Sequence, residues 1–178
     1  LTDKLSSWKA PKSKFKSPPP PHAPKKAIEI VTLKKKLQAH IVYGFLGTTV
    51  KNADRYALEV MNNVLSGQGG RLFIELRDKR GLAYAVSSST QEGLEPGYIS
   101  VYMGTDVSKL DDSLKGIRVE LDRIRNEPVA EAEIERAKRF IIGNYELDLQ
   151  KNSSVAALTA YHAAYDLGTG EIFKYPER

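Results

Sequence analysis

Apolar residues follow two different spacings along this chain, and the change between them restricts the folds that it can adopt. Before residue 105, four short segments have the alternating or compact apolar pattern that is typical of β-strands: 27–33, 37–46, 82–90 and 98–104. From Val107 to Ile124, apolar residues instead recur every three or four positions, which indicates an amphipathic helix. Strands followed by helices with short connections predict an α+β fold, an antiparallel sheet covered on one side by helices.

Capping and breaking residues predict where the other helices begin and end. Asn52 is a suitable N-cap for a helix that Gly67 ends, and a short helix at 71–80 follows the glycine cluster 67–70 directly. The C-terminal third of the chain is predicted to hold three helices: 107–126, one from about Ala130, and 153–167.

The first 26 residues differ in composition from the rest of the 178. They contain six of the nine prolines, among them the run at 18–21, together with seven lysines. Proline runs favour extended polyproline II and like charges repel, so we predict a Pro/Lys-rich linker at 1–26 and one folded domain at 27–178.

The net charge of +5 does not indicate a nucleic-acid-binding protein. Residues 1–36 hold ten lysines against Asp3 and Glu29, a net of +8, and the rest holds 17 basic and 20 acidic side chains, a net of −3. The body is therefore mildly acidic, and no nucleic-acid partner is expected. No apolar run approaches the roughly 20 residues that a membrane span needs, so no membrane partner is expected either.

Several common kinds of catalytic and cofactor site are not encoded. His22, His40 and His162 lie far apart in the sequence, and none is paired with a Glu or His at i+3 or i+4, so no metal site is predicted on this chain. The cluster 67–70 follows a helix and lacks the Lys-Ser/Thr of a phosphate-binding loop. Ser87-Ser88-Ser89 lies within a predicted strand without a nearby base.

The block from residue 69 to residue 86 is the most informative part of the chain. A short helix passes through Gly81 into a strand, which places Arg77 near the helix end and Tyr84 at the third strand position. Residue types alone leave a structural interpretation open for both, in which Tyr84 is a core aromatic and Arg77 is a cation favoured by the helix dipole.

This block, with its Leu-Arg-x-x-x-Gly-Leu-x-Tyr core, resembles the second, inactive domain of a half-unit of the pitrilysin/insulinase-type zinc metallopeptidases, which include the mitochondrial processing peptidases. Ala130 departs from the Ser or Thr expected at a helix start. The chain also stops at Arg178 where another helix or two would follow, so a truncated domain is expected. The resemblance extends over most of the chain: Trp8, 38–41, 54–58, 71–84, Pro128-Val129 and 165–168.

The resemblance implies a specific role. In this family two halves close around a chamber, and the zinc motif HxxEH, which is missing here, lies in the other half. Arg77 and Tyr84, seven residues apart, match the pair that reaches into that zinc site, and Gly69 and Gly70 are candidates to contact the backbone of a peptide substrate. The expected cofactor is zinc in the partner half, with none on this chain, which alone is expected to be inactive.

A second function remains open from the same resemblance. Some homologues keep the fold without hydrolysis and serve as structural or assembly subunits, which would make the chain a non-peptidase scaffold.

Overall fold

The computed structural model describes residues 37–178 continuously and, before them, only residues 6–7, 19, 22, 25–26, 28 and 30–32. The linker predicted at 1–26 therefore lies mostly outside the described residues. The strand predicted at 27–33 lies partly outside them, and the four of its residues that are described are not in a strand.

Three antiparallel strands form the sheet: β1 (Gln38–Leu46), β2 (Ala83–Gln91) and β3 (Tyr98–Asp106). Their order is β1-β3-β2, with β3 in the centre. A hairpin connects β2 to β3. The helical segments between 54 and 78 connect β1 to β2, which lie on opposite edges of β3. These three strands confirm the predictions at 37–46, 82–90 and 98–104.

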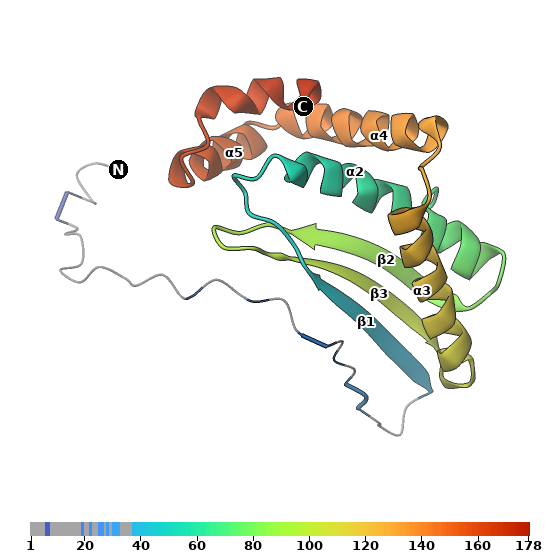
Figure 1. Ribbon diagram of the computed structural model, residues 1–178. Helices are drawn as coiled ribbons and strands as arrows, with labels where there is room; N and C mark the ends of the chain where they lie inside the picture. The colour runs from blue at the N-terminus through green and yellow to red at the C-terminus, as the bar shows by residue number, and fades with distance from the viewer. Residues whose placement is uncertain are drawn as a thin grey trace.

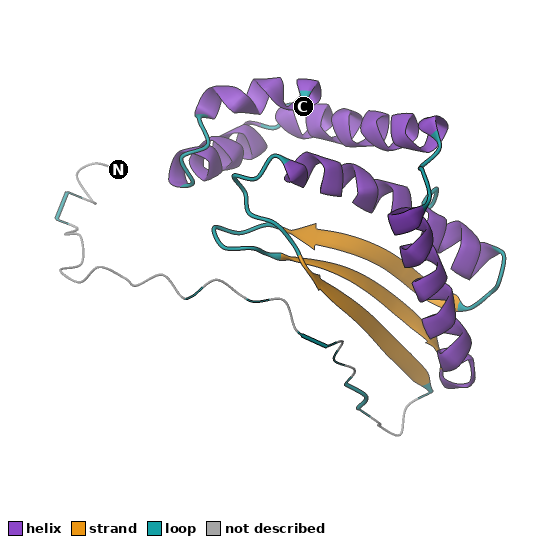
Figure 2. Ribbon diagram, in the orientation of Figure 1, coloured by secondary structure: helices purple, strands orange, loops and turns teal. Residues whose placement is uncertain are grey.

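The helices lie on one face of this sheet, and no described residue forms a helix on the other face (Figures 1 and 2). α2 (Asp54–Leu65) and α3 (Leu110–Asn126) contact the strands, and α4 (Glu131–Leu149) packs mainly on α2. α5 (Asn152–Ala164) and the 3-10 helix η3 (Thr169–Glu177) complete this outer layer. The α+β prediction, with helices on one side of an antiparallel sheet, is confirmed.

The core lies between the sheet and the inner helices. Ile41, Val101 and Met103 point inward from β1 and β3, and Ile117 meets them from α3. The stripe predicted from 107 to 124 is confirmed except at Val107, which is half exposed because it lies in the 3-10 turn η2 (Val107–Lys109) that precedes α3. Each such buried side chain contributes roughly 1.5–3 kcal/mol to folding.

Local signals explain the helix ends. The N-cap of α2 is Ala53, one residue after the predicted Asn52, whose side-chain oxygen accepts a 2.8 Å hydrogen bond from the backbone N–H of Asp54. Ala130 occupies the N-cap position before α4 and makes no side-chain capping hydrogen bond. α5 ends at Ala164, earlier than predicted, since Asp166 adopts a φ of 54° that a helix cannot continue through. No described helix is long and apolar enough to cross a membrane.

Candidate functional site

Arg77 lies on a π-helix, which replaces the ordinary helix predicted at 71–80. This element, η1, spans Phe73–Asp78, and the N–H of Lys79 continues its i→i+5 pattern by donating to the carbonyl oxygen of Ile74 at 3.0 Å. Such a π-helical turn is rare in proteins and is frequently found at functional sites. The guanidinium of Arg77 is exposed and lies 4.8 Å from the ring centroid of Phe73.

An ion pair anchors the beginning of this segment. Arg71 donates two hydrogen bonds to Glu133 on α4, at 2.8 and 2.7 Å. The pair holds the pKa of the Glu133 carboxyl below its usual range, chiefly because the carboxylate accepts these hydrogen bonds, and raises the pKa of Arg71.

A tight closure joins the π-helix to β2. Gly81 has a φ of +58°, which a residue without Cβ adopts readily, and its N–H donates to the carbonyl oxygen of Arg77 at 3.0 Å. The N–H of Leu82 donates to the carbonyl oxygen of Leu76 at 2.8 Å. The backbone at Arg77 is thus connected directly to the residues that begin β2.

Tyr84 is the extra residue of a β-bulge. Ala83 pairs with Thr105 and Ala85 pairs with Gly104, so Tyr84 has no partner residue on β3. Both Ala83 and Val86 pack into the core, and Tyr84 therefore points to the side of the sheet without helices, 79% exposed. The interpretation of Tyr84 as a core aromatic is wrong.

Buried hydroxyl groups hold the strand next to the bulge. Thr105 donates a 2.6 Å hydrogen bond to the carbonyl oxygen of Leu82, and Ser113 on α3 donates to Thr105 at 2.9 Å. Because Thr105 and Ser113 are almost completely buried, water competes little for their hydroxyl groups. Their hydrogen bonds therefore fix the start of β2 against α3.

The structure does not bring Gly69 and Gly70 together with Arg77 and Tyr84. The two glycines precede the helical segment whose far end carries Arg77. A Cβ on Gly70 would lie 2.2 Å from the carbonyl oxygen of Ser66, so packing alone requires glycine there. A Cβ on Gly69 would meet only the Arg136 side chain, at 3.6 Å, which leaves its predicted contact with substrate as a prediction.

The three histidines have different surroundings. His22 is exposed, His40 Nδ1 is 2.8 Å from the hydroxyl of Tyr102 on the sheet, and His162 Nδ1 is 3.0 Å from the carbonyl oxygen of Gly168. Among the described residues, no three His, Cys, Asp or Glu side chains lie close enough together to hold a metal ion.

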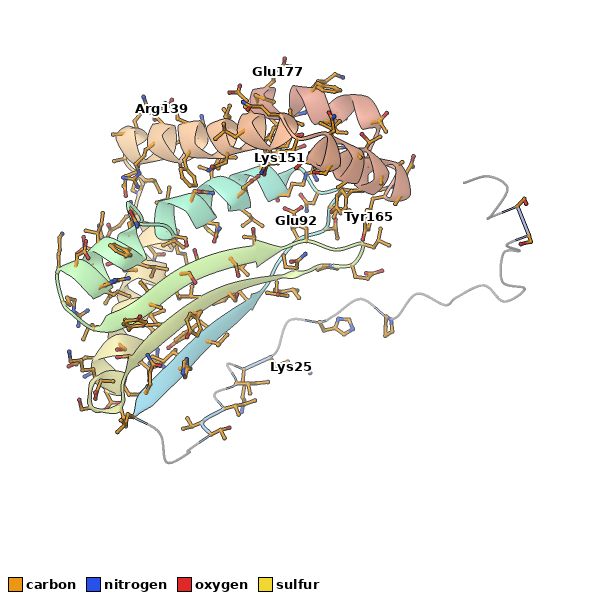
Figure 3. All side chains as sticks on the ribbon, turned by 180° about the vertical axis from the view of Figure 1, so that it is seen from behind. Lys25, Glu92, Arg139, Lys151, Tyr165 and Glu177 are labelled. Atoms are coloured by element: carbon orange, nitrogen blue, oxygen red, sulfur yellow. The ribbon has the colours of Figure 1, made fainter. Side chains whose placement is uncertain are left out.

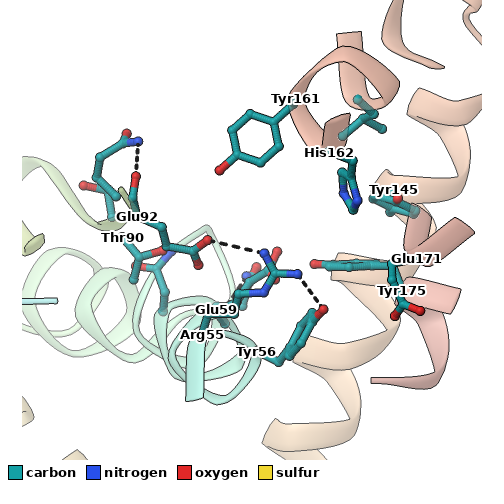
Figure 4. Close-up of a pocket in the computed structure, with 15 residues that line it drawn as sticks. Arg55, Tyr56, Glu59, Thr90, Glu92, Tyr145, Tyr161, His162, Glu171 and Tyr175 are labelled. Carbon is teal, nitrogen blue, oxygen red and sulfur yellow. Dashed lines mark hydrogen bonds and ion pairs between the residues drawn. The ribbon is translucent and has the colours of Figure 1, made fainter. Parts of the chain in front are cut away.

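A pocket that sequence reasoning did not identify lies at the other end of β2. Glu92 directly follows the last residue of β2, and Figure 3 shows it on the same side of the molecule as Tyr165, which follows α5. Between the end of β2, α2, α4, α5 and η3 is a cavity of about 480 Å³, in which Arg55 lies 3.9 Å from Glu92 and donates a 2.6 Å hydrogen bond to Tyr56 (Figure 4). Arg55 and Tyr56 fall in a segment that was matched to the family, but no local spacing relates them to Glu92.

With this geometry in place, comparison with known proteins assigns the family. Residues 1–141 match the family model described as the peptidase M16 inactive domain. The chain belongs to this family. The resemblance to the inactive domain of pitrilysin/insulinase-type metallopeptidases is therefore confirmed.

Two curated relatives support the assignment to the M16 family. An uncharacterized zinc protease of Streptomyces coelicolor is 37% identical over 123 residues, which cover 68% of this chain and 27% of that protein. The uncharacterized zinc protease YmxG of Bacillus subtilis is 34% identical over 128 residues, or 71% of this chain and 31% of YmxG. The chain thus spans about three tenths of the length of these relatives.

A solved M16 inactive domain from Pseudomonas fluorescens has the same fold. It superimposes with a TM-score of 0.72 at 24% identity, over 80% of this chain and 34% of that one. A protease from Helicobacter pylori superimposes with a TM-score of 0.67 at 23% identity, over 73% and 32% of the two chains. At these identities the superpositions show the fold alone.

Proposed function

We propose that this M16 inactive domain is the non-catalytic, substrate-positioning part of a two-half zinc metallopeptidase. It supplies Arg77 and Tyr84 to a zinc site carried by an HxxEH-bearing half, in the same polypeptide or in a separate subunit. Three facts support this proposal: the curated relatives are named zinc proteases, this chain lacks HxxEH, and it spans only part of their length.

The exposure of Tyr84 at the β-bulge carries the proposal. A bulge turns a side chain away from the direction that regular alternation would give it, and bulges are frequent next to active sites. Here the bulge leaves a large aromatic side chain 79% exposed, on a strand that is locked to the exposed Arg77 through Gly81. Both side chains are therefore free to reach a group outside this domain.

Their chemistry suits peptide hydrolysis. Zinc, bound in the other half, would supply an activated water. The attacked carbonyl oxygen of the substrate gains negative charge, and the Tyr84 hydroxyl can donate a hydrogen bond to it. The Arg77 guanidinium adds fixed positive potential or holds a substrate carbonyl. Loss of one such donor typically costs ~2.7–4 kcal/mol of transition-state stabilisation.

The test is complementation with an HxxEH-bearing half. The chain alone should bind no stoichiometric zinc and cleave no peptide, whereas the combined halves should hydrolyse a quenched fluorescent peptide. Tyr84→Phe should lower kcat by roughly 10²-fold or more, because it removes only the hydroxyl. Tyr98→Phe is the matched control, since Tyr98 is also an exposed tyrosine of the sheet, 53% exposed. It begins β3, at the opposite end of the sheet from the bulge that carries Tyr84.

The outcomes separate the two functions. Wild-type turnover in Tyr84→Phe, with its folding confirmed by circular dichroism, would exclude the role given to this hydroxyl. A complex that forms with the HxxEH-bearing half and yet hydrolyses no peptide would favour the structural or assembly homologue instead.

A further inference from the structure

The cavity near Glu92 has an excess of negative charge. Its lining contains one guanidinium, that of Arg55, against the carboxylates of Glu59, Glu92 and Glu171. Glu171 is already paired with Lys174 and Arg178. Arg55 pairs with Glu92, so the carboxylate of Glu59 has no paired cation among the described residues.

The guanidinium of Arg55 already interacts with two neighbouring side chains. Its guanidinium lies 4.5 Å from the ring centroid of Tyr56, donates to the Tyr56 hydroxyl, and pairs with Glu92. Its side chain is only 17% exposed. The guanidinium is therefore poorly placed to serve as the receptor for an incoming anion, which Glu59 and Glu92 would also repel.

Tyrosine rings form much of the remaining wall. Tyr145 and Tyr175 stack with ring centroids 4.2 Å apart, and Tyr161 faces them from α5 across the cavity (Figure 4). Aromatic faces attract cations, by about 0.5–2 kcal/mol depending on how far water is excluded. Burial raises the pKa of Tyr175, and the hydrogen bond that its hydroxyl donates to the Glu59 carboxylate raises it further, so the hydroxyl stays neutral.

The surroundings of Glu92 also favour an additional cation. Burial raises the pKa of the Glu92 carboxyl and the negative charge of Glu59 raises it further, although the nearby Arg55 lowers it. A positive group bound in the cavity would oppose both of the effects that raise this pKa.

We propose that this cavity binds the basic side chain of a peptide, a lysine ammonium or an arginine guanidinium. Such a group brings positive charge and hydrogen-bond donors to Glu59 and Glu92, and an aliphatic stem to the tyrosine rings. A volume of about 480 Å³ lies within the range of ligand pockets and accommodates one long side chain. The site is separate from the surface formed by Arg77 and Tyr84, so it does not depend on their role.

The experiment titrates the full chain with blocked amino acids and follows backbone amide shifts by NMR. Nα-acetyl-lysine methylamide and the arginine equivalent should give saturable shifts around Glu92 and along the first turns of α2. Nα-acetyl-norleucine methylamide, which has the same stem without the ammonium, should give none. Glu92→Gln should weaken lysine binding by about tenfold, since a charged acceptor becomes neutral.

Two controls make the result decisive. Glu146→Gln removes one negative charge from an exposed position of α4 outside the cavity and should leave the affinity unchanged. Equal binding of the norleucine probe would show a merely apolar cavity, and the absence of lysine-dependent shifts in the wild type would overturn the proposal. An equal loss of affinity in Glu92→Gln and Glu146→Gln would reduce the effect to net charge and would also overturn it.

Discussion

Arg71 and Glu133, 62 residues apart in sequence, form a bidentate ion pair that joins the start of the helical segment carrying Arg77 to α4. The two side chains are 9% and 24% exposed, and the Nη1 atom of Arg71 is buried without a partner among the described residues. Among the described residues, the guanidinium therefore hydrogen-bonds to a single carboxylate, and the position of the π-helix depends on that contact. The negative charges of Glu120 and Glu127 stabilise the guanidinium more weakly.

Removing the Glu133 charge should destabilise the fold. We expect Glu133→Gln to lower the free energy of unfolding by about 1–3 kcal/mol, because a mostly buried guanidinium loses its counter-ion. Urea denaturation measures the change. Glu135→Gln, which breaks only the exposed 3.6 Å pair with Lys138, should change stability by less than about 0.5 kcal/mol. Equal effects of the two substitutions would contradict the anchoring role of Glu133.

The same pair predicts a pH dependence. The pKa of Glu133 is lowered in the folded chain, mainly by the hydrogen bonds from Arg71, from its ordinary value of 4.5. A lowered pKa means that the unfolded chain takes up the proton first, so the stabilisation is complete above about pH 4.5 and is lost as the pH falls below it. The difference in unfolding free energy between wild type and Glu133→Gln should thus shrink in acid. A difference that stays constant down to pH 3 would exclude this linkage.

Substitution by alanine should affect the stability of the fold differently at Gly69 and at Gly70. Gly70→Ala forces a methyl group against the Ser66 carbonyl oxygen and should cost about 2–3 kcal/mol or prevent folding. Gly69→Ala meets no such obstacle and should leave stability unchanged or raise it by up to about 1 kcal/mol. Thermal unfolding compares the two. A raised KM in stable Gly69→Ala, assayed with the complementing half, is expected only if Gly69 contacts the substrate.

The hydroxyl group of Thr105 should contribute measurably to the stability of the fold. Thr105→Val keeps the shape but leaves the Leu82 carbonyl oxygen without its buried donor, and should cost about 1–3 kcal/mol. Ser89→Ala removes a hydroxyl from the exposed pair with Ser100 and serves as the control, with a change below about 0.5 kcal/mol. Denaturant unfolding provides both values, and a neutral Thr105→Val would show that this hydrogen bond does not stabilise the start of β2.

Some parts of the fold follow from local sequence because their signals are local. The apolar spacing of α3 and the alternation of β3 each report one buried face, and Asn52 satisfies a helix N–H within its own turn. The π-helix was not predicted, because Leu72 and Leu76 are four residues apart, the spacing of buried residues in an ordinary α-helix, and both are buried. The cavity near Glu92 was not predicted either, since its lining residues come from the end of β2 and from four helices that are distant in the sequence.

The sequence by itself determined the family of this chain, the α+β class, and the presence of Arg77 and Tyr84 seven residues apart. Tertiary structure alone decided which way Tyr84 faces. Ala83 and Val86 would point in opposite directions in a regular strand, and both reach the core only because β3 offers partners to each across a bulge. That long-range pairing, which no local pattern records, places the Tyr84 side chain in solvent.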